Sequence, residues 1–481
     1  MVGSSVRLAV NGAVPTVETT QWGSLVLPTS PLFGTDGIRG QAGQLLTAPL
    51  AMQVGYWAGL VLQQQGGAVG PVLVGQDSRT SGYMLATALA AGLTSAGLDV
   101  WQLGLCPTAA VAYLTKAMGA VGGIMISASH NPPADNGIKF FAADGTKLPV
   151  LLQQRIEAAL RGTGDLQPAA TGRWGQCYSR PELIDRYLDF LHDPFPTGLA
   201  LGGMRIVLDM AWGSAAGIAE RAFAGTQANI VGLHGLPDGD RINVNCGSTH
   251  LGALQAAVQA HNADIGFAFD GDADRVLAVD AQGRIVDGDY ILYFWGKTLR
   301  DTNRLPEDTI VSTVMANLGF ERAWNHLGGT LVRTQVGDQY VHAAMVERGA
   351  KLGGEQSGHI LCHHYSLTGD GILTALHLAD LVHQCGGSLS ALVDRSFQTY
   401  PQRLENVRVA DRDRIKHWQD SAPIQTAIAA AQADMGDRGR VLVRPSGTEP
   451  LIRVMVEAEH QSLVDHWTDH IALTVRQHLV G

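Results

Sequence analysis

A loop in the first third of the chain carries a serine and a histidine in a setting that suits chemistry. Residues 123–141 read GIMISASHNPPADNGIKFF, so an apolar, strand-like run leads into a loop that contains Ser129 and His130. The two prolines that follow lack a backbone N–H and stiffen this loop. A Ser-His hydrolase is possible, but glycine is missing from both positions that flank the serine in its G-x-S-x-G motif. Two interpretations remain: a rigid serine that acts as a nucleophile, or a Ser/Asn turn that caps the next element.

Two cations lie in unusual local settings. Lys139 is inside the second apolar run of the same segment, where a charge costs free energy unless it faces a polar site. We therefore expect Lys139 to face a cleft. Arg39 belongs to FGTDGIRG at residues 33–40, whose glycines allow the backbone to approach a ligand closely.

Three carboxylates are crowded into one short loop. The segment IGFAFDGDADRVLAVD, residues 265–280, places Asp270, Asp272 and Asp274 between two apolar runs. Carboxylates so close together repel one another, and a hard divalent cation such as Mg²⁺ or Mn²⁺ relieves that repulsion better than zinc. An EF-hand is excluded, because its sixth and twelfth positions hold Arg275 and Ala281 rather than Gly and Glu. A solvated acidic turn remains the structural alternative.

A third segment offers groups that suit sugar hydroxyls. In KLGGEQSGHIL, residues 351–361, the side chains of Glu355, Ser357 and His359 stand at alternate positions. In an extended loop alternate side chains share one face. A polar turn without function is an equal alternative.

A fourth segment offers groups that suit a phosphate dianion. In VLVRPSGTEPLIRVMVE, residues 441–457, a tight turn joins two strand-like runs and holds Arg444, Ser446, Gly447 and Thr448, with Arg453 on the next strand. Guanidinium, hydroxyl and backbone N–H donors in a concave turn bind phosphate well. A purely structural turn is the alternative. Residues 296–298, GKT, are not a P-loop, because residue 291 is Ile where that motif needs Gly.

Taken together, the loops supply a fixed serine, a site for a hard metal, a sugar-recognition loop and a phosphate-binding turn. Phosphoryl transfer on a phosphorylated sugar requires all four. The combination is far more specific than any single loop.

The elements that must position these loops recur along the chain. Strand–turn–helix patterns at residues 71–96, 204–217 and 309–319 predict several α/β domains rather than one large sheet. We expect an N-terminal extension at 1–30, then domains at 31–178, 179–287, 288–396 and 397–481, the last one smaller. Ser179 and Glu182 predict a capping box that starts the second domain, and a helix is expected to open the third near 287–290.

Composition limits the class of protein. The 481 residues carry a net charge of −10, which argues against an extended nucleic-acid-binding face. The five cysteines are far apart and form no CxxC pair, as expected of free thiols in a reducing compartment. Neither a convincing signal peptide nor an 18-residue apolar run is found in the sequence. We therefore expect a cytoplasmic protein that binds neither membrane nor nucleic acid.

The motifs, in this order, resemble those of the α-D-phosphohexomutase family. The resemblance runs from about Pro31 to about Glu457 and rests on FGTDGIRG, SASHNPPADNGIKFF, DGDADR, GGEQSGH, TGDGILTALHLAD and RPSGTEPLIRVMVE. It implies three topologically related α/β domains and a smaller C-terminal α+β domain around a central cleft.

The resemblance also implies a role for each site residue. Ser129 would be the phosphoserine that donates its phosphoryl group, and one of its oxygens would join Asp270, Asp272 and Asp274 in holding one Mg²⁺. The remaining roles fall into three groups: Arg39, His130, Lys139 and Arg275 around the transferred phosphoryl group, with Lys139 as general base or acid; Glu355, Ser357 and His359 on the sugar; and Arg444, Ser446, Gly447, Thr448 and Arg453 on the other phosphate.

Within the family, the branch that acts on glucosamine phosphates is the most similar. Gln356 in GGEQSGH and the run TGDGILTAL match that branch, whereas Gln339 stands where the branch often has arginine. The implied reaction interconverts glucosamine 6-phosphate and glucosamine 1-phosphate through glucosamine 1,6-bisphosphate. A phosphomannomutase/phosphoglucomutase and a non-catalytic sugar-phosphate-binding protein are the alternatives, and a homodimer is left open.

Overall fold

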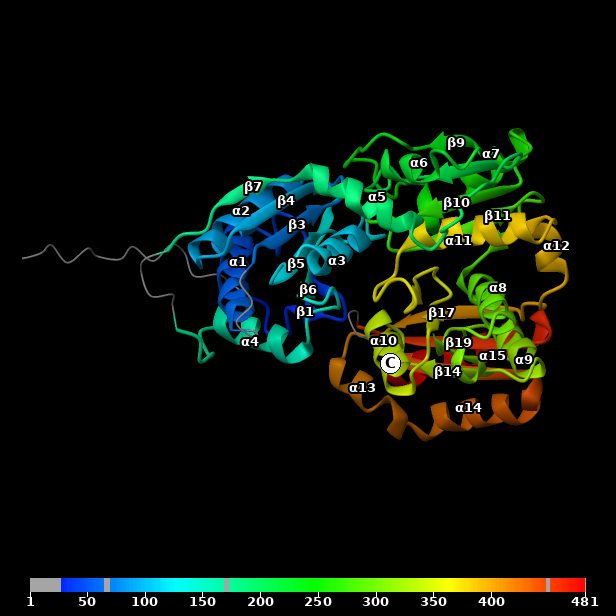
Figure 1. The fold of residues 1–481 in the computed structure, drawn as a ribbon. Helices are drawn as coiled ribbons and strands as arrows, with labels where there is room; N and C mark the ends of the chain where they lie inside the picture. Colours follow the sequence, from blue (N-terminus) through cyan, green and yellow to red (C-terminus); the bar gives the residue numbers. More distant parts are fainter. Residues whose placement is uncertain (1–26, 65–69, 168–172, 447–449, 481) are drawn as a thin grey trace, which may run out of the picture.

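The computed structural model describes residues 27–64, 70–167, 173–446 and 450–480, and Figure 1 shows their arrangement. Most of the expected N-terminal extension, together with Gly447 and Thr448, lies outside these residues. The described residues form four β-sheets, each with its own helices. Among the described helices, none combines the length and the apolar character that a membrane span requires.

The first sheet has seven strands in the order β1-β2-β6-β5-β3-β4-β7. β3 is parallel to β4 and β5, and β5 is antiparallel to β6. The strands are β1 (Phe33–Gly34), β2 (Gly37–Gln41), β3 (Val72–Gln76), β4 (Val100–Leu105), β5 (Gly122–Ile126), β6 (Asp135–Ala142) and β7 (Cys177–Ser179). The helices are α1 (Ala48–Gln63), α2 (Gly82–Ser95), α3 (Thr108–Ala117) and α4 (Val150–Leu160).

The second sheet repeats the central part of this arrangement. Its order is β12-β11-β10-β8-β9, with β8 parallel to β9 and β10, and β10 antiparallel to β11. Its elements are β8 (Arg205–Asp209), α6 (Ile218–Phe223), β9 (Asn229–Leu233), α7 (Gly252–Ala260), β10 (Ile265–Phe269), β11 (Val276–Asp280) and β12 (Ile285–Val286).

The third sheet repeats it again, in the order β14-β13-β15-β16. β13 is parallel to β14 and β15, and β15 is antiparallel to β16. The strands are β13 (Thr309–Thr313), β14 (Thr330–Thr334), β15 (Leu352–Gly354) and β16 (Ile360–Cys362). The helices are α8 (Gly288–Asp301), α9 (Leu318–His326), α10 (Asp338–Arg348), α11 (Gly371–Gln384) and α12 (Leu389–Asp394).

This repetition confirms three topologically related α/β units, and it has a consequence for the site. In each unit the third strand of the repeat leads through a short connection into an antiparallel fourth strand. These connections are residues 127–134, 270–275 and 355–359, which we call the serine loop, the aspartate loop and the glutamate loop. Three of the four segments singled out in the sequence thus occupy one equivalent position in three units.

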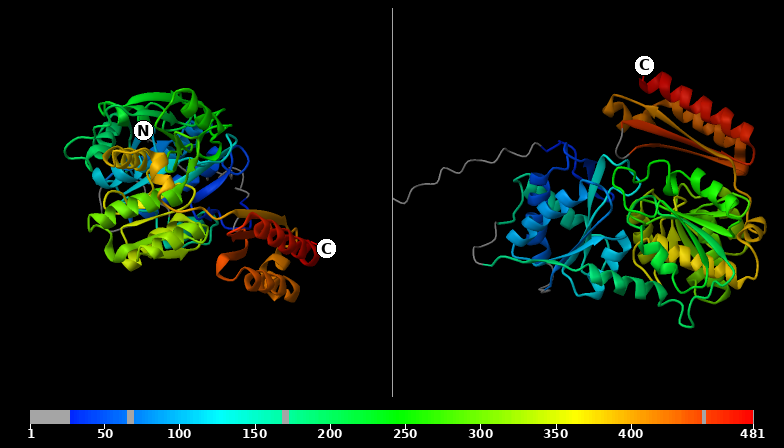
Figure 2. Two further views of the ribbon diagram at one scale, coloured as in Figure 1. Left: turned by 90° about the vertical axis from the view of Figure 1, so that its right-hand side faces the viewer. Right: turned by 90° about the horizontal axis from the view of Figure 1, so that it is seen from above.

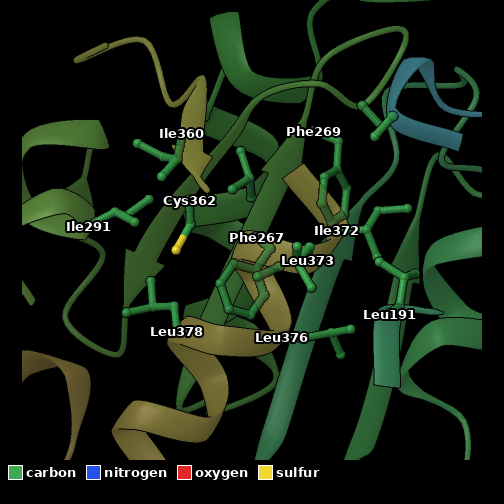
Figure 3. Close-up of a cluster of buried hydrophobic side chains, with 14 of the residues drawn as sticks. Leu191, Phe267, Phe269, Ile291, Ile360, Cys362, Ile372, Leu373, Leu376 and Leu378 are labelled. Carbon is green, nitrogen blue, oxygen red and sulfur yellow. The ribbon is translucent and has the colours of Figure 1, made fainter. Parts of the chain in front are cut away.

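The second and third units share a hydrophobic core. Phe267 and Phe269 of β10 pack together with Ile372 and Leu376 of α11, as Figure 3 shows. Helix α11 belongs to the third unit by sequence but contacts β10 and β11 of the second sheet. Burial of this apolar surface fixes the two units against each other.

The predicted helix near residue 288 is confirmed as α8, capped by the Asp287 side chain, which accepts from Asp289 N and Tyr290 N. The predicted capping box is wrong. Ser179 still belongs to β7, and a 3₁₀ turn at Pro181–Leu183 precedes α5 (Ile184–His192). Because Ser179 continues the strand, Glu182 instead pairs with Arg180 Nε at 2.5 Å.

The C-terminal unit confirms the expected smaller α+β domain. Its antiparallel sheet has the order β17-β19-β18, and α14 and α15 contact each other and the sheet. Figure 2 shows it as a lobe beside the other three units. Its elements are β17 (Gln402–Arg408), α13 (Arg412–Lys416), α14 (Ala422–Met435), β18 (Gly439–Pro445), β19 (Leu451–Ala458) and α15 (Gln461–Val475).

Arg440 and Glu457 attach this lobe to the third unit, together with Gln402, whose Nε2 donates to Met315 O at 3.4 Å. The Arg440 guanidinium donates to the carbonyl oxygens of Val314 and Ala316 at 2.8 and 2.6 Å. The buried Glu457 carboxylate accepts from the backbone N–H of Leu318 at 2.8 Å. The contact therefore lies on the connection between β13 and α9.

Candidate active site

The serine loop and the aspartate loop meet at a hydroxyl–carboxylate contact. Ser129 follows β5 closely, is 1% exposed and has a left-handed backbone with φ 54°. Its Oγ donates to Asp270 Oδ2 at 2.5 Å and lies 3.2 Å from His130 Nδ1. The structure thus brings the predicted nucleophile against the predicted metal site.

A buried ion pair holds the serine loop in place. Arg79 and Asp77 lie just after β3, and Arg79 Nε donates to Asp77 Oδ2 at 3.0 Å with both side chains at 0% exposure. The Ser127 hydroxyl donates to Asp77 Oδ2 at 2.6 Å and accepts from Ser129 N at 2.9 Å. The Arg79 guanidinium also donates to four carbonyl oxygens of the loop and its exit, those of Ser129 (2.9 Å), Asn131 (2.7 Å), Asp135 (2.9 Å) and Pro132.

A second support comes from the second unit. Asn243 Nδ2 donates to the carbonyl oxygens of Ser129 and Asn131 at 2.9 and 3.1 Å. Sequence reasoning missed Asn243, Asp77 and Arg79. A charged pair directly after the apolar strand in PVLVGQDSRTSG was the available signal for the last two.

The three aspartates form a buried acidic cluster. Asp270, Asp272 and Asp274 each offer an oxygen within 4.8 Å of the others. Burial and the charges of Asp274 and Asp272 raise the pKa of Asp270 to about 8. Among the described residues, Asp272 Oδ1 and Asp274 Oδ1 are buried and have no hydrogen-bond partner. Buried carboxylate oxygens without donors, in an all-oxygen set, fit a hard divalent cation.

Lys139 crosses from the first unit to this cluster. It lies on β6, is 2% exposed, and its Nζ lies 2.6 Å from Asp272, 3.0 Å from Asp274 and 3.1 Å from Asp36. Burial lowers the pKa of Lys139, but the charges of Asp272, Asp274 and Asp36 outweigh this effect and hold it well above its ordinary value. Lys139 is therefore protonated in this state. These three carboxylates explain why a charged side chain is tolerated within an apolar run.

Two arginines face the same region. Arg39 Nε and Arg275 Nε are buried and have no hydrogen-bond partner among the described residues. Burial together with the charges of Arg275 and Arg39 lowers the pKa of His130 to about 4. His130 is accordingly neutral near pH 7, and its ring nitrogen beside Ser129 Oγ can take either role in a hydrogen bond.

The glutamate loop differs from the expected extended conformation. Gly358 N donates to Glu355 O at 2.9 Å, which closes a turn. Gly358 has φ +88°, and a Cβ there would lie 2.1 Å from Val276 O, so only glycine fits. The prediction of one shared face is wrong because the chain turns here to pass β11.

Two of the three side chains of this loop still reach the site. His359 Nδ1 lies 3.5 Å from Asp274 Oδ1, and Nε2 lies 3.4 Å from Asp338 Oδ2. Burial lowers the pKa of His359, but Asp274 and Asp338 reverse the effect and raise it to about 9. Glu355 is 8% exposed and accepts from Gly337 N at 3.1 Å, whereas Ser357 is partly exposed.

The predicted phosphate-binding turn brings two arginines together. Arg444 and Arg453 are directly opposite each other on β18 and β19, and Arg453 Nη2 lies 3.5 Å from Ser446 Oγ. Burial and the charge of Arg453 lower the pKa of Arg444. Like charges in this position suit an anion.

Comparison with known proteins identifies the fold family. Models of phosphoglucomutase/phosphomannomutase match the chain in four segments: α/β/α domain I at residues 30–165, domain II at 185–283, domain III at 287–400 and the C-terminal domain at 404–474. The chain therefore belongs to the phosphoglucomutase/phosphomannomutase family, and the resemblance found in its motifs is confirmed.

Two similar curated relatives are named phosphoglucosamine mutase. The phosphoglucosamine mutase of Trichodesmium erythraeum (strain IMS101) is 61% identical over 468 residues, which cover 97% of this chain and 95% of the relative. That of Synechococcus elongatus is 61% identical over 464 residues, covering 96% and 98%.

Solved structures share the fold. A phosphoglucomutase/phosphomannomutase family protein from Burkholderia thailandensis superposes with a TM-score of 0.78 at 25% identity, covering 93% of this chain and 97% of that one. Aspergillus fumigatus N-acetylphosphoglucosamine mutase in complex with GlcNAc-6P and magnesium has a TM-score of 0.63 at 20% identity, covering 93% and 95%.

Proposed function

We propose that this chain is a phosphoglucosamine mutase, an isomerase that interconverts glucosamine 6-phosphate and glucosamine 1-phosphate. The observation that carries the chemistry is the contact of 2.5 Å between Ser129 Oγ and Asp270, in a buried cluster of three aspartates. The substrate class rests on relatives named phosphoglucosamine mutase that are about 60% identical over nearly the whole chain.

In the proposed reaction, Ser129 carries the phosphoryl group. The bond between phosphorus and Ser129 Oγ breaks as a free hydroxyl of the bound sugar monophosphate forms a new P–O bond, giving glucosamine 1,6-bisphosphate. Asp270, Asp272, Asp274 and an oxygen of the phosphorylated Ser129 would hold one Mg²⁺, which supplies charge neutralisation when bound. Arg39 and Arg275 would bind the oxygens of the transferred group.

Lys139 is placed to serve the proton transfer. The attacking hydroxyl must lose a proton, and Ser129 Oγ must gain one when the phosphoryl group has left. Three carboxylates hold the proton on Lys139 in the metal-free protein. Two of these, Asp272 and Asp274, are in the proposed metal-ligand set. If they engage a cation, they would hold that proton less firmly, and Lys139 could then exchange it. Neutral His130 would orient Ser129 Oγ.

The second half of the reaction uses the other loops. Glu355, Ser357 and His359 would bind the sugar, while Arg444, Ser446, Gly447, Thr448 and Arg453 would grip the phosphate that is not being transferred. The bisphosphate must exchange its two ends before the other phosphate returns to Ser129.

We place this reaction in the cytoplasm, since the described cysteines are all free thiols.

A side-by-side assay tests the proposal. The wild type and Ser129→Ala should be compared on glucosamine, glucose and mannose monophosphates, with phosphate on Ser129 followed by peptide mass spectrometry. We expect the highest kcat/KM for glucosamine phosphates, phosphate on Ser129, and no turnover by Ser129→Ala. Higher kcat/KM for glucose or mannose phosphates would favour a phosphoglucomutase/phosphomannomutase, and binding without turnover would favour a sugar-phosphate-binding protein.

A further inference from the structure

Six charged side chains from the first three units form a closed ring in which positive and negative groups alternate. We call it the charge ring. The six successive contacts are Lys139–Asp36 at 3.1 Å, Asp36–Lys147 at 2.5 Å, Lys147–Asp338 at 2.6 Å, Asp338–His359 at 3.4 Å, His359–Asp274 at 3.5 Å and Asp274–Lys139 at 3.0 Å. One side of the ring belongs to the reacting centre, and the other side has no assigned role.

The side without a role is the accessible one. Side-chain exposure is 3% for Lys139, 5% for His359 and 6% for Asp274, but 25% for Lys147 and 12% for Asp338. Lys147 follows β6 in the first unit, and Asp338 begins α10 in the third. A ligand can therefore reach the Lys147–Asp338 pair without entering the buried cluster.

Asp338 is also tied to the glutamate loop. The backbone N–H of Gly337 donates to the Glu355 carboxylate at 3.1 Å, so the start of α10 and this loop are held together. His359 Nε2 is 3.4 Å from Asp338 and has no hydrogen-bond partner in the described part of the chain, although His359 is only 4% exposed. His359 therefore does not hydrogen-bond to the Asp338 carboxylate, which can accept from another donor at this place.

We propose that the Asp338 carboxylate binds the ammonium group of the amino-sugar phosphate, in exchange for Lys147. The inference rests on the proposed function and names the residue that recognises the amino group. The Lys147 side chain ends in a primary ammonium group, the same chemical group as the protonated amine of the sugar. Lys147 thus occupies a position on Asp338 that the substrate ammonium can take over.

Other carboxylates near the site are less suited to this role. Asp36 already faces three cations, Lys139, Lys147 and Arg39. Glu355 accepts from Gly337 N and lies close enough to Arg275 to contribute to its raised pKa. Asp338 has one strong cationic partner, Lys147, and that partner is the most exposed member of the ring.

The exchange predicts opposite effects for its two members. Without the Asp338 charge, the protein loses its preference for an amine over a hydroxyl. Without the Lys147 ammonium, Asp338 is left for the substrate alone, and the preference increases. Glucose phosphate has a hydroxyl in place of the ammonium group and cannot replace Lys147. It therefore gains nothing from the Asp338 carboxylate or from the exchange.

The test is the ratio of kcat/KM for glucosamine 1-phosphate to kcat/KM for glucose 1-phosphate, measured for the wild type, Asp338→Asn, Lys147→Met and Asp36→Asn. Loss of a hydrogen bond to a charged group predicts a ratio about tenfold or more lower in Asp338→Asn. The ratio should rise in Lys147→Met and should not rise in Asp36→Asn, which also removes a charge from the ring but leaves Lys147 paired with Asp338.

General damage to the ring lowers kcat/KM for both substrates together and leaves their ratio constant. An unchanged ratio in Asp338→Asn therefore overturns the inference. A lower ratio in Lys147→Met overturns it as well, and this arm decides if Asp338→Asn does not fold. A wild type without preference for the amino sugar contradicts the proposed function itself, and a wild type with that preference and an unaltered ratio in both variants contradicts only the role of Asp338.

Discussion

At the scale of single residues, the aspartate loop is under electrostatic strain without a cation. Burial and two neighbouring carboxylates raise the pKa of Asp270 from 3.8 to about 8. Between these values the folded state binds a proton that the unfolded state does not, so the metal-free protein should lose stability as the pH rises through this window. A cation that replaces the proton removes this penalty.

Magnesium binding to the metal-free protein should accordingly release protons below pH 8 and weaken as the pH falls, by up to about tenfold per pH unit. Isothermal titration in buffers of different ionisation enthalpy, on both sides of this pH, measures both quantities. Asp270→Asn should abolish the proton release. An affinity that does not change with pH would contradict the role of Asp270.

Sequence alone identified site residues whose charge is unusual for their local surroundings. Lys139 stands out in an apolar run, and three aspartates stand out in one loop. Lys147 and Asp338 do not stand out, because each lies in a polar stretch and they are 191 residues apart. Only the tertiary fold brings such partners together, and the charge ring could not be predicted for that reason.

At the scale of elements, the site is built from three equivalent strand connections. The strand–turn–helix pattern predicted several α/β domains, which the structure confirms. Their equivalence at the site was not predictable, since the three loops differ in length and in chemistry. The alternate spacing of Glu355, Ser357 and His359 suggested an extended loop. The same spacing also occurs in turns, and Gly358 reverses the chain here.

The Arg79–Asp77 pair gives the element-scale prediction. Arg79→Met leaves a buried carboxylate without its partner, which should lower the free energy of unfolding by about 3–5 kcal/mol. The double variant Asp77→Asn/Arg79→Met has no unpaired charge and should recover part of this loss. Urea denaturation measures both.

Turnover separates the two roles of the pair. Both variants lose the donors that hold the serine loop, so both should turn over slowly even where the double variant regains stability. A double variant with wild-type turnover would show that Arg79 stabilises the fold without positioning Ser129.

At the scale of the whole molecule, the C-terminal lobe is attached to the third unit through Arg440 and Glu457, while its own arginine pair is on the turn between β18 and β19. This separates attachment from ligand binding. The sequence predicted the arginine turn, but not the attachment, because Arg440 donates to backbone carbonyls that carry no sequence signal.

Arg444→Ala should raise KM for both monophosphates by about 10- to 150-fold, since a charge-assisted contact contributes about 1.5–3 kcal/mol. It should also let the bisphosphate escape, so that turnover depends on added sugar 1,6-bisphosphate. Steady-state assays with and without bisphosphate decide this. Arg408→Ala, on the same sheet and exposed, is the matched control and should leave both quantities unchanged.

The left-handed backbone at Ser129 limits which amino acids can stand there during evolution. Threonine also has a hydroxyl, but β-branched residues rarely adopt a positive φ such as the 54° found here. Asparagine, aspartate and glycine tolerate this conformation but lack a hydroxyl. Among the residues with an aliphatic hydroxyl, only serine satisfies both the backbone and the chemistry, so this position has no conservative substitute.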